Sequence, residues 1–150
     1  MAKRTSFKKT QKPRSSSNNF SPSSENEFIV WTFRTIDRDG KFAFDTNRKD
    51  FDFKNFVDKM LEYSKLRWRE LREHTHDENK SKHHFLSEDS LSESAIERIK
   101  KKQFEDRTDS IFSFALNNKV RIIGLRDGAE FQVIWYDANH EFAISNKKHT

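Results

Sequence analysis

The chain has 150 residues and a net charge of +5, a length that is enough for one domain with a hydrophobic core and too short for two ordinary domains. Only 33% of the residues are hydrophobic against 35% charged, so the core must be concentrated, and fifteen phenylalanines supply much of it. No apolar run approaches a membrane span and cysteine is absent, which excludes disulfides, thiolate nucleophiles and cysteine-based zinc sites and leads us to expect a soluble cytoplasmic protein with no membrane partner.

The basic character of the chain is confined to its first 24 residues. This segment holds six basic residues and no acidic one, and the rest of the chain holds the other 23 basic residues against all 24 acidic ones. Its Ser-, Lys- and Asn-rich composition predicts a disordered basic arm over residues 1–24. The arm is either a solubilising tail or an electrostatic contact to RNA, DNA or the ribosome. In the second case the contacts come from Lys3, Arg4, Lys8, Lys9, Lys12 and Arg14.

A β-hairpin is predicted at the start of the folded part. The stretch FIVWTFRTI is rich in β-branched and aromatic residues, Asp37–Gly40 has turn chemistry, and KFAFD resumes the alternation of apolar and other residues. We expect one folded domain over residues 25–145, followed by a short tail over residues 146–150.

Two helices are predicted after the hairpin. An Asp at position 50 or 52 can cap a helix over about residues 52–63, in which apolar side chains recur at steps of three and four. These apolar residues are Phe53, Phe56, Val57, Met60 and Leu61. Ser64 can cap the second helix, KLRWRELREH.

Residues 74–87 are polar and irregular and predict a loop that contains four histidines. Zinc needs three or four ligands that converge from ordered structure, and this loop lacks the usual spacing, so we expect no metal and no other cofactor. The histidines are His74, His76, His83 and His84. Together with Lys82, the His83-His84 pair is a candidate for phosphate contacts. The capping box Ser90-x-x-Glu93 then predicts a third helix, SESAIERIKKK.

The last third predicts a three-strand meander with strands at Ile111–Leu116, Lys119–Arg126 and Ala129–Tyr136. Asp127-Gly128 is a strong hairpin signal, because both central residues of a type I′ turn need positive φ. Strict alternation would put Trp135 on the same face as Phe131 and Val133.

The expected fold is therefore α+β. A mostly antiparallel sheet, made of the N-terminal hairpin and the C-terminal meander, carries two to three helices on one face. Its expected core includes Phe33, Phe56, Met60, Leu61, Ile99, Ile122, Val133 and Trp135.

Charged residues cluster near the end of the meander. Arg121 lies among apolar neighbours, so it either pairs with Asp137 or Glu141 or faces a polar cleft. His140 lies near an acid and two arginines, a set that can provide general acid–base catalysis and stabilise developing negative charge. A structural alternative is that Asp137 only forms an Asx turn that ends the strand.

The run R-I-I-G followed by F-x-V-x-W-Y-D-x-x-H, from Arg121 to His140, resembles a group of small, largely uncharacterised bacterial proteins. These proteins are often carried on mobile elements and end in a W-x-D-P-x-H motif, in which this chain has Ala138 at the proline position. The resemblance extends to F-R-T-I-D, F-A-F and the segment around Trp68, and it implies no activity.

The chain is also distantly similar to the RelE/HigB-like toxins, in which a strand and helices precede an antiparallel meander. That resemblance implies a metal-independent endoribonuclease that acts on RNA, with the ribosome and a cognate antitoxin protein as partners. It assigns Arg121 and Arg126 to the phosphate, His140 to general acid or base catalysis, and Tyr136 to orientation or proton transfer, with Asp137 beside them. The alternative from another class is a non-enzymatic nucleic-acid- or protein-binding protein of a mobile element.

Overall fold

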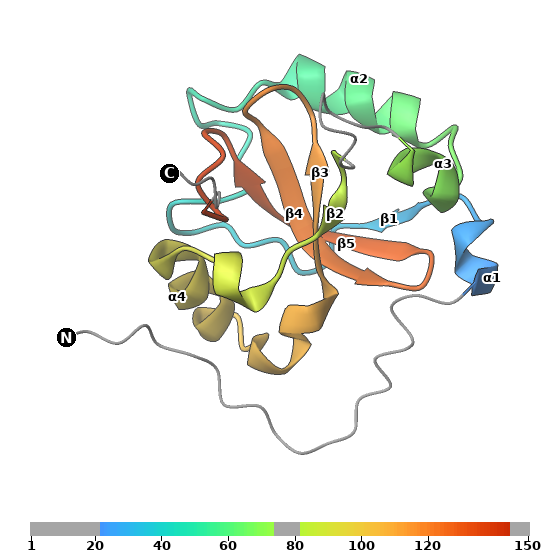
Figure 1. Ribbon diagram of the computed structural model, residues 1–150. Coiled ribbons are helices and arrows are strands. Elements are labelled where there is room, and N and C mark those ends of the chain that lie inside the picture. The colour runs from blue at the N-terminus through green and yellow to red at the C-terminus, as the bar shows by residue number, and fades with distance from the viewer. Residues whose placement is uncertain (1–21, 74–81, 145–150) are drawn as a thin grey trace, which may run out of the picture.

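The computed structural model describes residues 22–73 and 82–144 (Figure 1). A five-stranded sheet has the strand order β1-β5-β4-β3-β2, with β1 parallel to β5 and every other pair antiparallel. The strands are β1 (Val30–Thr32), β2 (His84–Phe85), β3 (Ile111–Ala115), β4 (Arg121–Asp127) and β5 (Glu130–Asp137). The helices are α1 (Pro22–Glu25), α2 (Phe53–Tyr63), α3 (Trp68–Arg72) and α4 (Glu93–Lys101), with short 3₁₀ turns η2 (Glu88–Ser90) and η3 (Glu105–Ser110). The α+β prediction is confirmed, although the sheet is mixed.

The C-terminal meander forms as predicted, within a residue or two at each strand end. β3 pairs with β4 and β4 with β5. The predicted type I′ turn is wrong, because Asp127 pairs with Glu130 inside the strands and, of Asp127 and Gly128, only Gly128 has a positive φ, of +65°. Gly128 is the first central residue of the loop, where a type II′ turn needs glycine. In this part of the chain, alternation and glycine-containing turns predict where the strands lie, although not the face of every residue in β5.

The predicted N-terminal hairpin does not form. β1 pairs in parallel with β5, and the KFAFD segment is not a strand. Its backbone is bonded to β5 instead: the Asp37 N–H donates to the Ile134 carbonyl at 3.0 Å, and the Phe42 carbonyl accepts from the Tyr136 N–H at 3.0 Å. A partner distant in sequence therefore replaced the local one that the hairpin prediction assumed.

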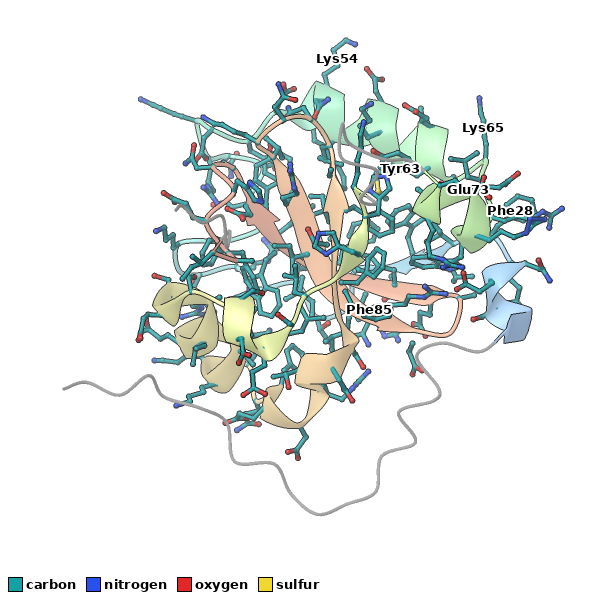
Figure 2. All side chains as sticks on the ribbon, in the orientation of Figure 1. Phe28, Lys54, Tyr63, Lys65, Glu73 and Phe85 are labelled. Carbon is teal, nitrogen blue, oxygen red and sulfur yellow. The ribbon has the colours of Figure 1, made fainter. Side chains whose placement is uncertain are left out.

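The helices lie on both faces of the sheet, in contrast to the expected one-face arrangement (Figure 1). α2 begins at its predicted cap, where the Asp52 carboxylate accepts from the Asn55 N–H. It packs with α3 on one face, where Tyr63 points toward the sheet while Lys54 projects outward (Figure 2). α4 covers the other face, with Ala95, Ile96 and Ile99 buried against residues of β4 and β5. Its cap is Ser92, whose hydroxyl accepts from the Ala95 N–H, and not Ser90.

Most of the predicted core is buried. Phe56, Ile99, Ile122, Val133 and Trp135 are fully or almost fully buried, and Met60 packs partly buried against the same cluster as Phe56. Two predictions are wrong: Phe33 is 40% exposed and Leu61 is 61% exposed. The Phe33 ring makes edge contacts with the rings of Phe44 and Phe56 but is otherwise exposed. Leu61 lies on the solvent side of α2.

A β-bulge in β5 overturns the predicted face of Trp135. Ile123 pairs with Trp135 and the next residue, Gly124, pairs with Val133, so Ile134 is an extra residue in β5. Trp135 consequently packs on the α4 face, while Phe131 and Val133 pack on the α2 face. The same shift turns Tyr136 to the α2 face and leaves Asp137 on the α4 side of the sheet.

Gly124 permits this bulge. A Cβ at this position would lie 1.8 Å from the Gln132 carbonyl oxygen, a backbone atom that cannot rotate away. We expect Gly124→Ala to lower the free energy of unfolding by about 3 kcal/mol, as overpacking does when backbone must move. Chemical denaturation measures this. Gly128→Ala is the control, because nothing lies within 4 Å of its Cβ position and only its positive φ costs about 1–2 kcal/mol. Equal losses in the two variants would contradict the clash at Gly124.

A buried carboxylate joins α4 to β5. Asp37 is 2% exposed and accepts from Arg98 Nε and Nη2 at 2.9 Å each, from Trp135 Nε1 at 2.9 Å and from the Asp39 N–H at 3.2 Å. Burial by itself would raise the pKa of Asp37, but the hydrogen bonds from Arg98, Trp135 and Asp39 outweigh it and hold the pKa below its usual value.

The lowered pKa of Asp37 makes the free energy of unfolding depend on pH in the acid range. The contribution is complete above the unfolded pKa of about 4 and is lost as the pH falls through the lower folded pKa. We expect Asp37→Asn to lose about 3 kcal/mol at pH 7, because it breaks a buried ion pair. Between about pH 4 and pH 2, the free energy of unfolding should fall less in this variant than in the wild type, because the variant has no carboxylate at position 37 to protonate. Denaturation series at several pH values measure both effects, and parallel losses in acid would contradict the role of Asp37.

Candidate functional site

A cavity of about 520 Å³ lies on the α4 side of the sheet, next to β2 and to the segment that precedes α4. Its size is typical of small-molecule sites. The C-terminal segment closes it, since Leu91 and Ala143 form a β-bridge and the Ile144 N–H donates to the Ser90 carbonyl at 2.6 Å. Among its lining residues, those with polar side chains are Lys82, His84, Ser87, Ser90, Ser113, Arg121, Asp137 and His140.

Arg121 and Asp137 are register partners at the joined ends of β4 and β5, so both belong to the same face of the sheet. Arg121 is 7% exposed, and its Nη1 donates to the carbonyls of Asn117 and Val120 at 2.8 and 3.1 Å. Burial lowers the pKa of Arg121, against the opposing charge of Asp137. Within the described residues it forms no ion pair and its remaining N–H groups make no hydrogen bond, so it faces a polar cleft and does not pair with Asp137 or Glu141.

Asp137 shapes the turn that carries His140. Its two carboxylate oxygens accept the N–H groups of Glu141 at 2.9 Å and of Phe142 at 2.8 Å. These donors lie four and five residues on, so Asp137 has a structural role but does not form the expected Asx turn, which bonds the N–H two residues on. Burial raises the pKa of Asp137, while these N–H donors and the charge of His140 act against the rise. His140 is exposed and has a φ of +59°. Asp137 is thus committed to structure, and it presents His140 at the rim of the cavity.

His84 and Ser113 complete the polar wall from β2 and β3, where they are register partners. His84 Nδ1 lies 3.0 Å from the Phe85 carbonyl, which can only accept, so Nδ1 carries the proton and Nε2 is the acceptor nitrogen. Ser113 is 4% exposed, and its hydroxyl makes no hydrogen bond in the part of the chain that the structure describes. A buried, unpaired hydroxyl beside a buried arginine is typical of a site that receives a polar ligand.

Arg126 lies away from this cavity. It lies five positions after Arg121 along β4, or about 16 Å in an extended strand. Its side chain is 0% exposed and lies on the α2 face, with Nη2 2.7 Å from the Glu25 carboxylate and the guanidinium 3.8 Å above the Trp68 ring. Arg126 therefore anchors α1 to the sheet. Since Ser24 and Glu25 are buried, the folded part begins a few residues earlier than residue 25.

Tyr136 is also separated from His140, because the bulge turns it to the α2 face. Its ring stacks on Phe51 at 4.0 Å between centroids, and its hydroxyl accepts from the Asp52 N–H at 3.0 Å. Burial raises the pKa of Tyr136. The side chain supports the start of α2 and does not line the cavity.

The predicted histidine loop is split by the fold. His83 is 1% exposed; its Nδ1 accepts from the Ala115 N–H, and its ring packs against Tyr63 at 5.0 Å between centroids. Lys82 and His84 line the cavity. His74, His76 and the six basic residues of the arm lie outside the described residues. Within residues 22–73 and 82–144, no group of three or more His, Cys, Asp or Glu side chains could hold a metal ion.

Ser113 was not predicted as a site residue. The signal for it was present: in IFSFA, a single hydroxyl interrupts an otherwise apolar strand whose neighbours, Phe112 and Phe114, are both buried on the other face. A polar residue inside such a strand indicates either a buried hydrogen bond or a cavity.

Comparison with known proteins identifies no relative of this chain. No protein-family model, no curated protein and no solved structure matches the chain. In the described part of the chain, no helix has the length and apolar character needed to cross a membrane. The functional argument therefore rests on the cavity itself.

Trp135 and His140 should differ sharply in their contribution to stability. Trp135→Ala empties a fully buried aromatic site and should lower the free energy of unfolding by about 3–5 kcal/mol. His140→Asn should change it by less than about 1 kcal/mol, because the side chain is exposed and asparagine tolerates the left-handed backbone. Urea titrations measure both values. A loss for His140→Asn as large as that for Trp135→Ala would make His140 a structural residue.

Proposed function

We propose that this protein is a metal-independent endoribonuclease and that the cavity of Arg121, His84 and His140 binds the phosphate to be cleaved. The observation that carries the proposal is the buried Arg121 guanidinium, which turns unbonded N–H groups to a cavity with two histidines at its wall and rim. Arginine is suited to phosphate because its planar fork can donate two parallel hydrogen bonds.

The charge balance of the cavity favours an anion. Lys82 and Arg121 are cationic, and the two histidines can become so, while the acid among the lining residues is Asp137. Both oxygens of Asp137 already accept backbone N–H groups, which leaves it poorly placed to compete for a cation. A phosphodiester would meet the buried Arg121 guanidinium at low dielectric, where electrostatic stabilisation is strongest, while Lys82 and the histidines reach it from exposed positions.

The proposed reaction is cleavage by the RNA strand's own 2′-hydroxyl. His84 Nε2 accepts the 2′-hydroxyl proton while the 2′-oxygen bonds to phosphorus, and the protonated His140 donates a proton to the departing 5′-oxygen. Arg121 stabilises the charge that develops on the non-bridging oxygens. The products are a 2′,3′-cyclic phosphate and a free 5′-hydroxyl, and no water or metal takes part.

The proposal keeps the order of elements that the similarity to RelE/HigB-like toxins implied, with β1, α2 and α3 before the β3-β4-β5 meander, although β2 and α4 lie between them. The residue roles differ from those that the similarity implied. Arg126 and Tyr136 belong to the opposite face and are left out of the proposed reaction, and His84 takes a place in it. RNA, free or on the ribosome, and a cognate antitoxin remain the proposed partners.

Incubation of RNA with the protein in excess EDTA tests this function. We expect cleavage with 2′,3′-cyclic phosphate ends, and a loss of about two to four orders of magnitude in rate for His140→Asn and for His84→Asn. Arg121→Lys keeps the positive charge but loses the planar guanidinium with its two parallel donors, so it should also cleave RNA slowly. Arg34→Lys is its matched control, because Arg34 is 70% exposed and pairs with Glu130 at the far edge of the sheet.

The proposal fails if the wild type does not cleave RNA, with or without ribosomes, or if His84→Asn and His140→Asn cleave at the wild-type rate. A circular dichroism spectrum of each variant separates lost chemistry from lost folding.

A second candidate function is binding of a protein partner, favoured by the outer edge of β1. Within the described residues β1 pairs only with β5, and its Val30 is 54% exposed. Phe28, two residues before the strand, is 48% exposed. An edge strand of this kind can accept a strand from another chain. If Val30→Lys cleaves RNA at the wild-type rate, the outer edge of β1 takes no part in the proposed reaction.

A further inference from the structure

A row of polar side chains crosses three neighbouring strands inside the proposed phosphate site. His84 in β2 and Ser113 in β3 are register partners, and Ser113 is two residues from Ala115, the register partner of Arg121 in β4. Side chains two residues apart in a strand point to the same face, and neighbouring strands lie about 4.8 Å apart. Ser113 therefore lies between His84 and Arg121 on the same face of the sheet.

The Ser113 hydroxyl is buried without a hydrogen bond. Ser113 is 4% exposed and lines the cavity of about 520 Å³, and its hydroxyl makes no hydrogen bond within residues 22–73 and 82–144. The flanking Phe112 and Phe114 pack on the other face and cannot supply a partner. Because buried hydroxyls in proteins are almost always bonded, this group indicates a ligand that enters the cavity.

The neighbours of Ser113 restrict the chemistry of that ligand. The Arg121 guanidinium can only donate, so it cannot receive the hydroxyl proton of Ser113. A ligand that satisfies both side chains must accept hydrogen bonds from a cation and from a hydroxyl at adjacent positions. A phosphodiester can do so, because its two non-bridging oxygens share a negative charge and are bonded to the same phosphorus atom.

We propose that Ser113 is a further phosphate-binding residue of this site; the inference rests on the proposed function. Its hydroxyl donates a hydrogen bond to one non-bridging oxygen of the scissile phosphate, whose charge Arg121 stabilises. The phosphate then lies over β3 and β4, with His84 on the β2 side and His140 on the side of β5. The attacking 2′-oxygen faces His84 and the departing 5′-oxygen faces His140, so the two oxygens can lie in line with phosphorus.

A dinucleotide with a 2′-O-methyl group at the junction binds without reacting, and calorimetry with the full chain tests the contact. We expect Ser113→Ala to bind it about tenfold more weakly than the wild type, the effect of one hydrogen bond to a charged group. Without ligand, the variant should resist urea at least as well as the wild type, because the hydroxyl that it loses has no partner in the free protein. A serine with a merely structural role would not give weaker binding at unchanged stability.

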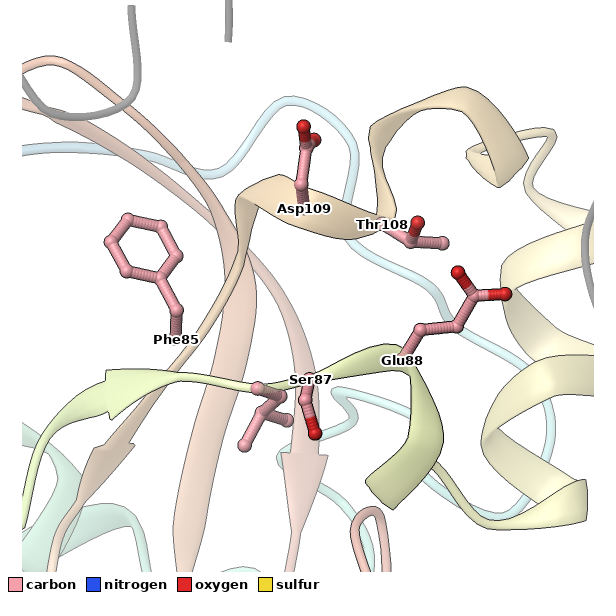
Figure 3. A pocket seen from close by; sticks show the side chains of 6 residues that line it. Phe85, Ser87, Glu88, Thr108 and Asp109 are labelled. Atoms are coloured by element: carbon pink, nitrogen blue, oxygen red, sulfur yellow. The ribbon is translucent and has the colours of Figure 1, made fainter. Parts of the chain in front are cut away.

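Thr108→Val is the matched control. Thr108 is another buried residue with a hydroxyl, 2% exposed, but it lines a second, smaller cavity of about 330 Å³ between the segment after β2 and η3 (Figure 3). Because Thr108 does not line the phosphate cavity, Thr108→Val should bind the dinucleotide with the wild-type affinity.

Sulfur substitution in RNA tests whether the hydroxyl contacts one particular oxygen. An RNA phosphorothioate has sulfur, a weak hydrogen-bond acceptor, in place of one non-bridging oxygen, and its two diastereomers differ in which oxygen is replaced. Ser113→Ala should slow the cleavage of one diastereomer about tenfold relative to the wild type. It should leave the cleavage of the other unchanged, because that substrate has already lost the hydrogen bond.

The outcomes separate this inference from the proposed function. If the wild type cleaves RNA and Ser113→Ala binds the dinucleotide with the wild-type affinity, the role of Ser113 is overturned and the reaction stands. An equal loss of binding in Thr108→Val, a loss of stability in Ser113→Ala, or equal slowing of both diastereomers also overturns the role of Ser113. If the wild type neither binds the dinucleotide nor cleaves RNA, both proposals are overturned.

Discussion

The β-bulge in β5 determines what each face of the C-terminal meander carries. Without it, alternation from Phe131 onward would keep Trp135 and Asp137 on the α2 face and Tyr136 on the other. With Ile134 as the extra residue, Asp137 lies opposite Arg121 and on the same face. The candidate site exists because one residue was added to a strand.

The N-terminal segment completes the outer edge of β5 around the bulge. β1 pairs with β5 only as far as Gln132, so the outer backbone groups of β5 beyond that point must be bonded elsewhere. The segment after β1 meets this need: Asp37 donates to the Ile134 carbonyl and Phe42 accepts from the Tyr136 N–H. The Trp135 indole, turned to the α4 side, donates to the Asp37 carboxylate that also binds Arg98. Bulge, N-terminal segment and α4 therefore stabilise one another.

The sequence predicted the elements that depend on local patterns but not the contacts between distant segments. The meander, α2 and α4 were predictable because each depends on local alternation, turn residues and caps. The hairpin prediction was wrong because the strand partner of Val30–Thr32 is a hundred residues away, in β5. The only local signal of the bulge was Gly124, which in an apolar strand is ambiguous between a bulge and a close backbone approach, and here it is both.

The site was predictable in the same partial way. Arg121, Asp137 and His140 were placed together because the end of one strand adjoins the start of its neighbour. Arg126 and Tyr136 were grouped with them by sequence proximity, but alternation and the bulge put them on the other face, where they are buried. His84, Ser113 and Thr108 reach the two cavities through β2, β3 and η3, and only the folded sheet brings these elements together.

The most direct test of this account is where an RNA phosphate binds. A dinucleotide with a 2′-O-methyl group at the junction cannot react, and its titration into isotopically labelled protein can be followed by the side-chain and backbone NMR signals. The account predicts shifts at the Arg121 Nε–H, at the rings of His84 and His140 and at the Ser113 amide, with Arg126 and Tyr136 unaffected. Shifts centred on Arg126 or on the exposed edge of β1, with Arg121 unchanged, would contradict it.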